Sequence, residues 1–189
     1  MRFKRLTWDE LPPPGGYGSQ TYRALVPAGS LPALQVGEQI IADSEAIAEY
    51  LEESVPLPPA LPTDIMQRAQ VRALGRFHDT KLEPCVRVLF SDIGKPHPND
   101  SALEQLQQRL GQLTRALALR PNIQFCLADC GLIVTLEWIT VMYESWELPL
   151  PFKRIITDYK QTMEELPWVA MELDTYRPLL AQWIQDKNP

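Results

Sequence analysis

Apolar side chains recur every three or four residues through the last two thirds of the chain, which is the spacing of amphipathic helices. One leucine stripe runs from Leu103 to Leu117, after a Ser101 and Glu104 pair that matches a capping box. Between Gly131 and Tyr143 the only charged residue is Glu137. A helix so apolar is expected at the centre of a bundle, surrounded by other helices.

Three further stretches complete a predicted all-helical domain over residues 63–189. A helix from Thr63 to about Asp92 is expected to kink or divide at Pro84, because proline cannot donate a backbone hydrogen bond. Two more apolar stripes run from Phe152 to Met163 and from Tyr176 to Ile184.

The first 62 residues have a different pattern and are predicted as a separate domain, 1–62. Two short apolar runs, Ala33–Val36 and Gln39–Ala42, flank a Gly-Glu pair and predict a β-hairpin. Asp43–Glu53 is typical of a helix, and Arg2–Thr7 is a candidate strand. Nine of the 18 prolines fall here, and the last four predict a stiff linker. The expected fold class is therefore α+β, mostly α.

Charge and composition narrow the partners. The chain has 18 Lys and Arg against 24 Asp and Glu, a net charge of −6, and no basic run, which disfavours nucleic-acid binding. The longest apolar stretch, Leu127–Tyr143, contains Asp129 and Glu137, so no membrane span is predicted. No apolar segment follows the basic first residues, so no signal peptide is predicted. Three cysteines do not make a disulfide framework, and a cytoplasmic location is the simplest expectation.

Other reactive side chains have simple structural interpretations. Cys126 and Cys130 share a helix face but lack Cys-x-x-Cys spacing, so buried structural thiols are expected there and at Cys85. His78 and His97 are isolated in the sequence, so no metal site is predicted. Two charged rows are interpreted as solvated helix faces, although the arginines could instead line a cleft between the halves; the rows are Glu45, Glu49, Glu52, Glu53 and Arg68, Arg72, Arg76.

Three motifs in this order resemble the glutathione transferase family. They are Val26-Pro27-Ala28-Gly29-Ser30-Leu31-Pro32-Ala33-Leu34, then Asp43-Ser44-Glu45-Ala46-Ile47, then Phe125-Cys126-Leu127-Ala128-Asp129. The resemblance covers about residues 20–189. It implies a thioredoxin-like N-terminal domain, here partial, followed by an all-helical C-terminal domain.

The resemblance also implies a glutathione site at Leu31, Pro32, Asp43 and Ser44. A cis bond before Pro32 would present the N–H and C=O of Leu31 to the cysteinyl backbone of glutathione. Ser44 and the first amides of its helix would hold the γ-glutamyl carboxylate, and Asp43 would face the α-ammonium group. From the residues alone, Asp43 and Ser44 indicate a helix N-cap, and Pro32 indicates the start of an edge strand.

Family members begin the buried helix with a Ser or Thr cap and an Asp three residues later. Here Cys126 takes the capping position and Asp129 follows it. Because a thiol is a poor acceptor, the cap is expected to be weaker by about 1 kcal/mol. This motif is expected to serve folding and not chemistry.

No catalytic residue is assigned. The family's thiol-activating Tyr, Ser or Cys lies just after the first strand, where it stabilises the glutathione thiolate. The match begins near the second strand, and Tyr17 and Ser19 have the right chemistry at the wrong position. We hypothesise that the chain is N-terminally incomplete by about 25 residues. Arg2–Thr7 would then either pair with Ala33–Val36 or stay loose.

Three functions remain as hypotheses. The first is a detoxifying transferase that conjugates glutathione, its co-substrate, to a hydrophobic electrophile if a complete form exists. Its pocket would be lined by Thr63–Asp92 and the C-terminus. The second is a non-catalytic binding or interaction module on the same fold. The third is a glutathione-dependent isomerase or lyase. The resemblance also implies that the protein forms a homodimer.

Overall fold

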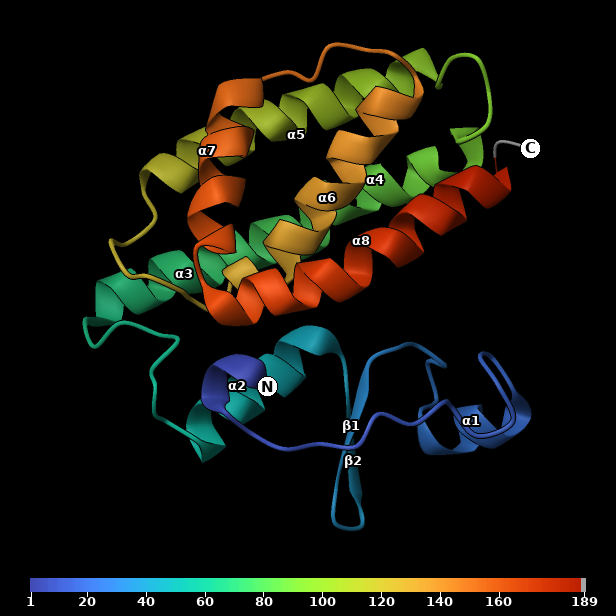
Figure 1. Ribbon diagram of the computed structural model, residues 1–189. Coiled ribbons are helices and arrows are strands. Elements are labelled where there is room, and N and C mark those ends of the chain that lie inside the picture. Colours follow the sequence, from blue (N-terminus) through green and yellow to red (C-terminus); the bar gives the residue numbers. More distant parts are fainter. Residues whose placement is uncertain (188–189) are drawn as a thin grey trace. The chain divides into compact units, whose positions relative to one another are not determined.

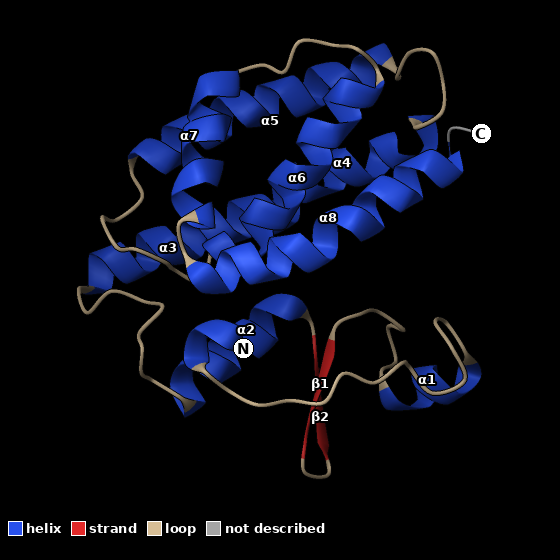
Figure 2. Cartoon of the chain, viewed as in Figure 1, coloured by secondary structure: helices blue, strands red, loops and turns tan. Residues whose placement is uncertain are grey.

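The chain forms two compact units, Met1–Ala60 and Leu61–Pro189, in a computed structural model that describes residues 1–187 (Figure 1). The first unit contains one small sheet and short helices, and the second consists of helices joined by loops (Figure 2). The fold class is α+β and mostly α, as predicted.

An antiparallel hairpin is the frame of the first unit. Strands β1 (Ala33–Val36) and β2 (Gln39–Ala42) have the predicted bounds, and Gly37 takes a φ of 60° in the tight turn between them. Helix α1 (Gln20–Leu25) precedes the hairpin and helix α2 (Ser44–Ser54) follows it. The register pairs Ala33 with Ala42, Leu34 with Ile41, Gln35 with Ile40, and Val36 with Gln39.

The prediction that Arg2–Thr7 forms a strand is wrong. Residues Arg2–Lys4 form one 3-10 turn, and Lys4 is only 7% exposed. Its Nζ donates to Glu52 Oε2 at 2.5 Å and to the Pro58 carbonyl at 2.8 Å. This buried ion pair holds the N-terminal turn against the end of α2 and the loop after it. It also removes Glu52 from the predicted solvated face.

The first helix of the second unit divides at the predicted place. Helices α3 (Ile65–Phe77) and α4 (Glu83–Leu89) are joined by a π-helical turn, His78–Leu82, and a 3-10 turn, Phe90–Asp92, follows α4. Pro84 lies in the first turn of α4, the part of a helix that best tolerates a residue without an N–H. The wider turn before it absorbs the change between the two helices.

Helix α5 (Asp100–Ala118) has the predicted stripe but a different start. The side chain of Asn99 accepts a hydrogen bond from Ala102 N at 3.0 Å, so Asn99 is the N-cap. The predicted capping box of Ser101 and Glu104 is wrong, because both residues already lie within the helix. The buried part of the stripe is Leu103, Leu106, Leu110 and Leu113.

Helix α6 (Asp129–Ser145) is the central helix of this unit, as predicted: it packs against α3, α4, α7 (Lys153–Glu164) and α8 (Pro167–Lys187), and nine of its residues are buried (Figure 1). Helix α8 is longer than the predicted Tyr176–Ile184 stripe. It begins at Pro167, since proline is compatible with the first turn of a helix.

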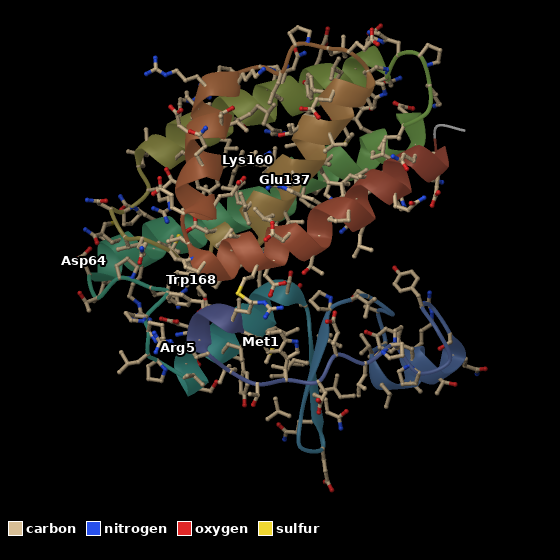
Figure 3. The ribbon with its side chains drawn as sticks, in the orientation of Figure 1. Met1, Arg5, Asp64, Glu137, Lys160 and Trp168 are labelled. Atoms are coloured by element: carbon tan, nitrogen blue, oxygen red, sulfur yellow. The ribbon has the colours of Figure 1, made fainter. Side chains whose placement is uncertain are left out.

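Glu137 lies in the middle of α6 and is only 3% exposed. Its carboxylate is 3.0 Å from Lys160 Nζ on α7 and accepts two hydrogen bonds from the Arg177 guanidinium on α8, at 2.9 and 3.1 Å. Figure 3 shows Glu137 and Lys160 close together inside the helical unit. Arg177 also pairs with Glu164. One buried carboxylate therefore joins three helices.

The π turn brings His78 against α6. The ring is buried, its Nε2 hydrogen bonds with Thr135 Oγ1 at 2.7 Å, and it lies over Gly131. Burial lowers the pKa of His78, although Asp79 opposes the shift, so the ring is neutral at pH 7. Only a residue without a side chain fits beneath the ring.

We predict that Gly131→Ala destabilises the protein by about 1–3 kcal/mol, because the added Cβ would lie 2.6 Å from His78 Cε1. Gly111→Ala in α5 is the matched control. Its Cβ would meet Phe152 at 3.4 Å, an ordinary contact, so this change is expected to be neutral or stabilising by about 0.5–1 kcal/mol. Urea unfolding measures both, and equal stability of the two variants would contradict the packing described.

We expect acid to lower the free energy of unfolding, because it protonates Glu137. Burial acts to raise the pKa of Glu137, but hydrogen bonds from Arg177 and Lys160 outweigh it and lower the pKa below 4.5. The ionised group therefore stabilises the fold above pH 4.5, and this stability is lost as the pH falls through the lowered pKa. We expect Glu137→Gln to lower the free energy of unfolding by about 1–3 kcal/mol at pH 7 and to flatten its decline below pH 4.5. Denaturant unfolding from pH 3 to 7 checks this, and an unchanged acid profile in the variant would refute it.

Candidate functional site

The hairpin brings the four predicted site residues to one place. Leu31 and Pro32 come directly before β1, and Asp43 and Ser44 come directly after β2. Because Ala33 pairs with Ala42, the start of β1 and the end of β2 lie side by side. The two dipeptides therefore form one corner of the first unit, which we call the hairpin corner.

Leu31 presents backbone groups at this corner. The Leu31–Pro32 bond is cis, as the resemblance implies. Leu31 is 53% exposed, and it lies before the first ladder pair, so strand pairing uses neither its N–H nor its C=O. The preceding Ser30 carbonyl is held by the Tyr22 hydroxyl at 2.8 Å. An extended backbone could pair with Leu31 without any particular side chain.

Asp43 is the N-cap of α2, as the residue pattern predicts. Its Oδ1 accepts hydrogen bonds from Glu45 N and Ala46 N, both at 3.0 Å, and its carbonyl accepts from Ile47 N at 3.0 Å. Its φ is 81°, a region that side chains other than glycine rarely adopt. The cap hydrogen bonds hold this conformation, and such outliers concentrate at functional sites.

Ser44 carries the free donors of this helix end. Within residues 1–187 its N–H and hydroxyl have no hydrogen-bond partner, and the residue is exposed. The resemblance implies that several helix amides hold a carboxylate, but two of them are already used by Asp43. The corner thus offers two donors on Ser44, the positive end of α2, the outer oxygen of Asp43, and the Leu31 backbone. Such a set suits a small peptide that carries both a carboxylate and an ammonium group.

The Asp129 motif has more partners than the sequence indicates. Asp129 is fully buried and accepts hydrogen bonds from Cys126 N at 2.7 Å, the Tyr159 hydroxyl at 2.8 Å, and the Arg120 guanidinium at 2.5 and 3.1 Å. Sequence analysis missed Arg120 and Tyr159, because no local spacing links them to Asp129. The Asp129 half of the expected reciprocal cap is present and strengthened, which agrees with a role in folding.

The cysteines differ from one another. Cys126 is buried, and burial together with the nearby Asp129 carboxylate raises its pKa to about 12, so the thiol stays protonated and unreactive. Cys85 is half-buried and Cys130 is exposed, so the prediction of a buried thiol is wrong for Cys130.

Tyr17 and Ser19, the two residues with the chemistry of a thiol-activating group, are not among the residues of the hairpin corner. Tyr17 is 75% exposed, while the Ser19 hydroxyl caps α1 by accepting from Tyr22 N at 3.0 Å and donates to the Pro14 carbonyl at 2.7 Å.

Among residues 1–187, no group of three or more His, Cys, Asp or Glu side chains could hold a metal ion. None of the described helices is both long and apolar enough to cross a membrane.

Comparisons with known proteins point to one family. Residues 1–59 match the family model described as glutathione S-transferase, N-terminal domain. Maleylpyruvate isomerase of Ralstonia sp is 41% identical over 126 residues, which is 67% of this chain and 47% of that protein. The matched segments span about half the length of the first curated relatives.

Solved structures share the fold across both units. A holo maleyl pyruvate isomerase, titled a bacterial zeta-class glutathione S-transferase, is 25% identical with a TM-score of 0.60, covering 80% of this chain and 76% of that one. A Bombyx mori glutathione transferase is 16% identical with a TM-score of 0.79, covering 99% and 87%. The first unit is thus thioredoxin-like, the second is the helical domain that accompanies it, and the chain belongs to the glutathione transferase family.

Proposed function

We propose that the hairpin corner binds glutathione and that the protein uses it as a cofactor for cis–trans isomerisation of a small unsaturated acid. The observation that carries the binding proposal is the position of Ser44. It places two unpaired donors at the positive end of α2, at the same hairpin corner as Leu31, which is 53% exposed.

Each group of glutathione finds a complementary group at this corner. The γ-glutamyl carboxylate accepts from the Ser44 N–H and hydroxyl, in the field of the helix end. The α-ammonium group faces the outer oxygen of Asp43, whose other oxygen is committed to the cap. The cysteinyl backbone pairs with the N–H and C=O of Leu31. Because Asp43 keeps two helix amides, fewer donors reach the carboxylate than in the full arrangement that the resemblance implies.

The relatives favour isomerisation over conjugation. Several curated matches are named maleylacetoacetate or maleylpyruvate isomerase. A thiolate can add to one carbon of a conjugated double bond, which gives an enolate whose former double bond rotates as a single bond. Elimination then restores the double bond and returns the thiolate. Glutathione is regenerated in this cycle, so it acts as a cofactor and is not consumed. The chain's own thiol-activating residue stays unassigned.

Conjugation of glutathione to an electrophile is the second candidate, because it shares the same binding site and the same first step. The two reactions differ in whether the adduct is released or eliminates the thiol. A non-catalytic module would bind glutathione through the same corner and do neither.

We predict that Ser44→Ala weakens glutathione binding about tenfold, because a hydrogen bond to a charged carboxylate is lost. Isothermal titration of the 189-residue chain with glutathione measures the change. Ser54→Ala is the matched control, since Ser54 lies at the other end of α2 and its hydroxyl donates to the Tyr50 carbonyl. Equal loss in both variants, or no binding by the unaltered chain, would remove the corner as a glutathione site.

The reaction is tested with maleylpyruvate and with an aromatic electrophile, each with the unaltered chain. Isomerisation that continues through many turnovers per glutathione supports the proposal. Stoichiometric loss of glutathione with the electrophile alone favours a conjugating transferase. Glutathione binding without either reaction would make the chain a binding module and contradict the enzymatic part.

A further inference from the structure

A second concave site lies wholly within the helical unit. The cavity has a volume of about 480 Å³ and lies against α6, α7 and the loop Leu148–Leu150 that connects them. This volume falls within the range of small-molecule pockets. None of the hairpin-corner residues lines it, so it is a different site from the proposed glutathione site.

Two of the four charged side chains on its wall are already neutralised. Lys160 pairs with Glu137 at 3.0 Å, and Glu164 pairs with Arg177. The other two, Glu144 on α6 and Lys153 on α7, are exposed and have no ion pair within the described residues. The cavity therefore carries one free anion and one free cation on two different helices.

The neutral lining supplies apolar surface and hydrogen-bonding groups. Leu148 and Leu150 contribute the apolar part. Thr157 and Gln161 have no side-chain hydrogen bond within residues 1–187. Tyr143, which also lines the cavity, is 1% exposed, and its hydroxyl has no hydrogen-bond partner in the same residues.

The Tyr143 hydroxyl makes no hydrogen bond of good geometry within residues 1–187, but the Gln107 side chain lies close enough to interact with it. Burial raises the pKa of Tyr143, although Gln107 on α5 lies near enough to offset part of the rise. The hydroxyl is therefore protonated at pH 7.

We propose that this cavity binds a zwitterion of amino-acid or dipeptide size with an apolar side chain. Its ammonium group faces Glu144, its carboxylate faces Lys153, and its side chain lies against Leu148 and Leu150. A simple anion would meet the unpaired carboxylate of Glu144, and a simple cation would meet the ammonium group of Lys153. A ligand with both charges is complementary to both sides of the cavity.

Leucyl-leucine is the probe, titrated into the 189-residue chain and followed by calorimetry. The zwitterion should bind saturably at one site. N-acetyl-leucyl-leucine, which lacks the ammonium group, and leucyl-leucine amide, which lacks the carboxylate, should each bind about tenfold more weakly. Equal binding of all three compounds would overturn the proposal, as would no binding of any.

Single substitutions test which cavity side chain recognises each charged group of the ligand. Glu144→Gln should remove the preference for the free ammonium group, and Lys153→Met the preference for the free carboxylate. Glu147→Gln and Arg154→Met are matched controls on exposed neighbours outside the cavity lining, and they should change neither preference. Saturating glutathione should leave the affinity for leucyl-leucine unchanged, and competition between the two would place the probe at the glutathione site and refute the second site.

Discussion

Helix α6 carries three buried polar side chains, Asp129, Thr135 and Glu137, and each of them needs a partner inside the helical unit. Asp129 pairs with Arg120 and accepts a hydrogen bond from Tyr159. Thr135 hydrogen bonds with His78. Glu137 pairs with Lys160 and Arg177. These partners come from the loop before α6, from the π turn, and from α7 and α8. Removing one partner leaves a buried polar or charged group exposed to an apolar interior, which costs far more than a surface contact. The polar groups of α6 thereby fix where the surrounding elements can lie.

The first unit depends on a different constraint. A two-stranded sheet is only marginally stable alone, so its neighbours must hold it. Helix α2 follows β2 directly, capped by Asp43, and the buried Lys4–Glu52 pair fastens the N-terminal turn to the end of that helix. The hairpin register then brings the start of β1, which follows Leu31 and Pro32, next to the end of β2, which precedes Asp43 and Ser44. The proposed site is thus a product of strand register and one helix cap, and it needs no side chain beyond Asp43 and Ser44.

Patterns that depend on neighbours in sequence were predictable. The hairpin bounds, the leucine stripe of α5, the buried α6 and the division near Pro84 all follow from periodicity or from a missing backbone donor. The Asp43 cap follows from residue type. Features that depend on distant partners were not predictable. Lys4 meets Glu52 across 48 positions, and its basic, apolar surroundings suggested a strand. Arg120 and Tyr159 meet Asp129 only in the folded bundle, and Asn99 displaced Ser101 as a cap by a shift of two residues.

At the candidate site, the four residues are a proposal that comes from the family resemblance, and the structure shows how their hydrogen-bond donors are shared. Asp43 holds Glu45 N and Ala46 N, which leaves Ser44 as the donor available to a ligand. The most direct test is a titration of the ¹⁵N-labelled chain with glutathione, followed through its backbone amide resonances. Our account predicts the largest shifts at Leu31 and Ser44 and little change at Glu45 and Ala46. Shifts confined to residues of the helical unit, or none at the hairpin corner, would contradict it.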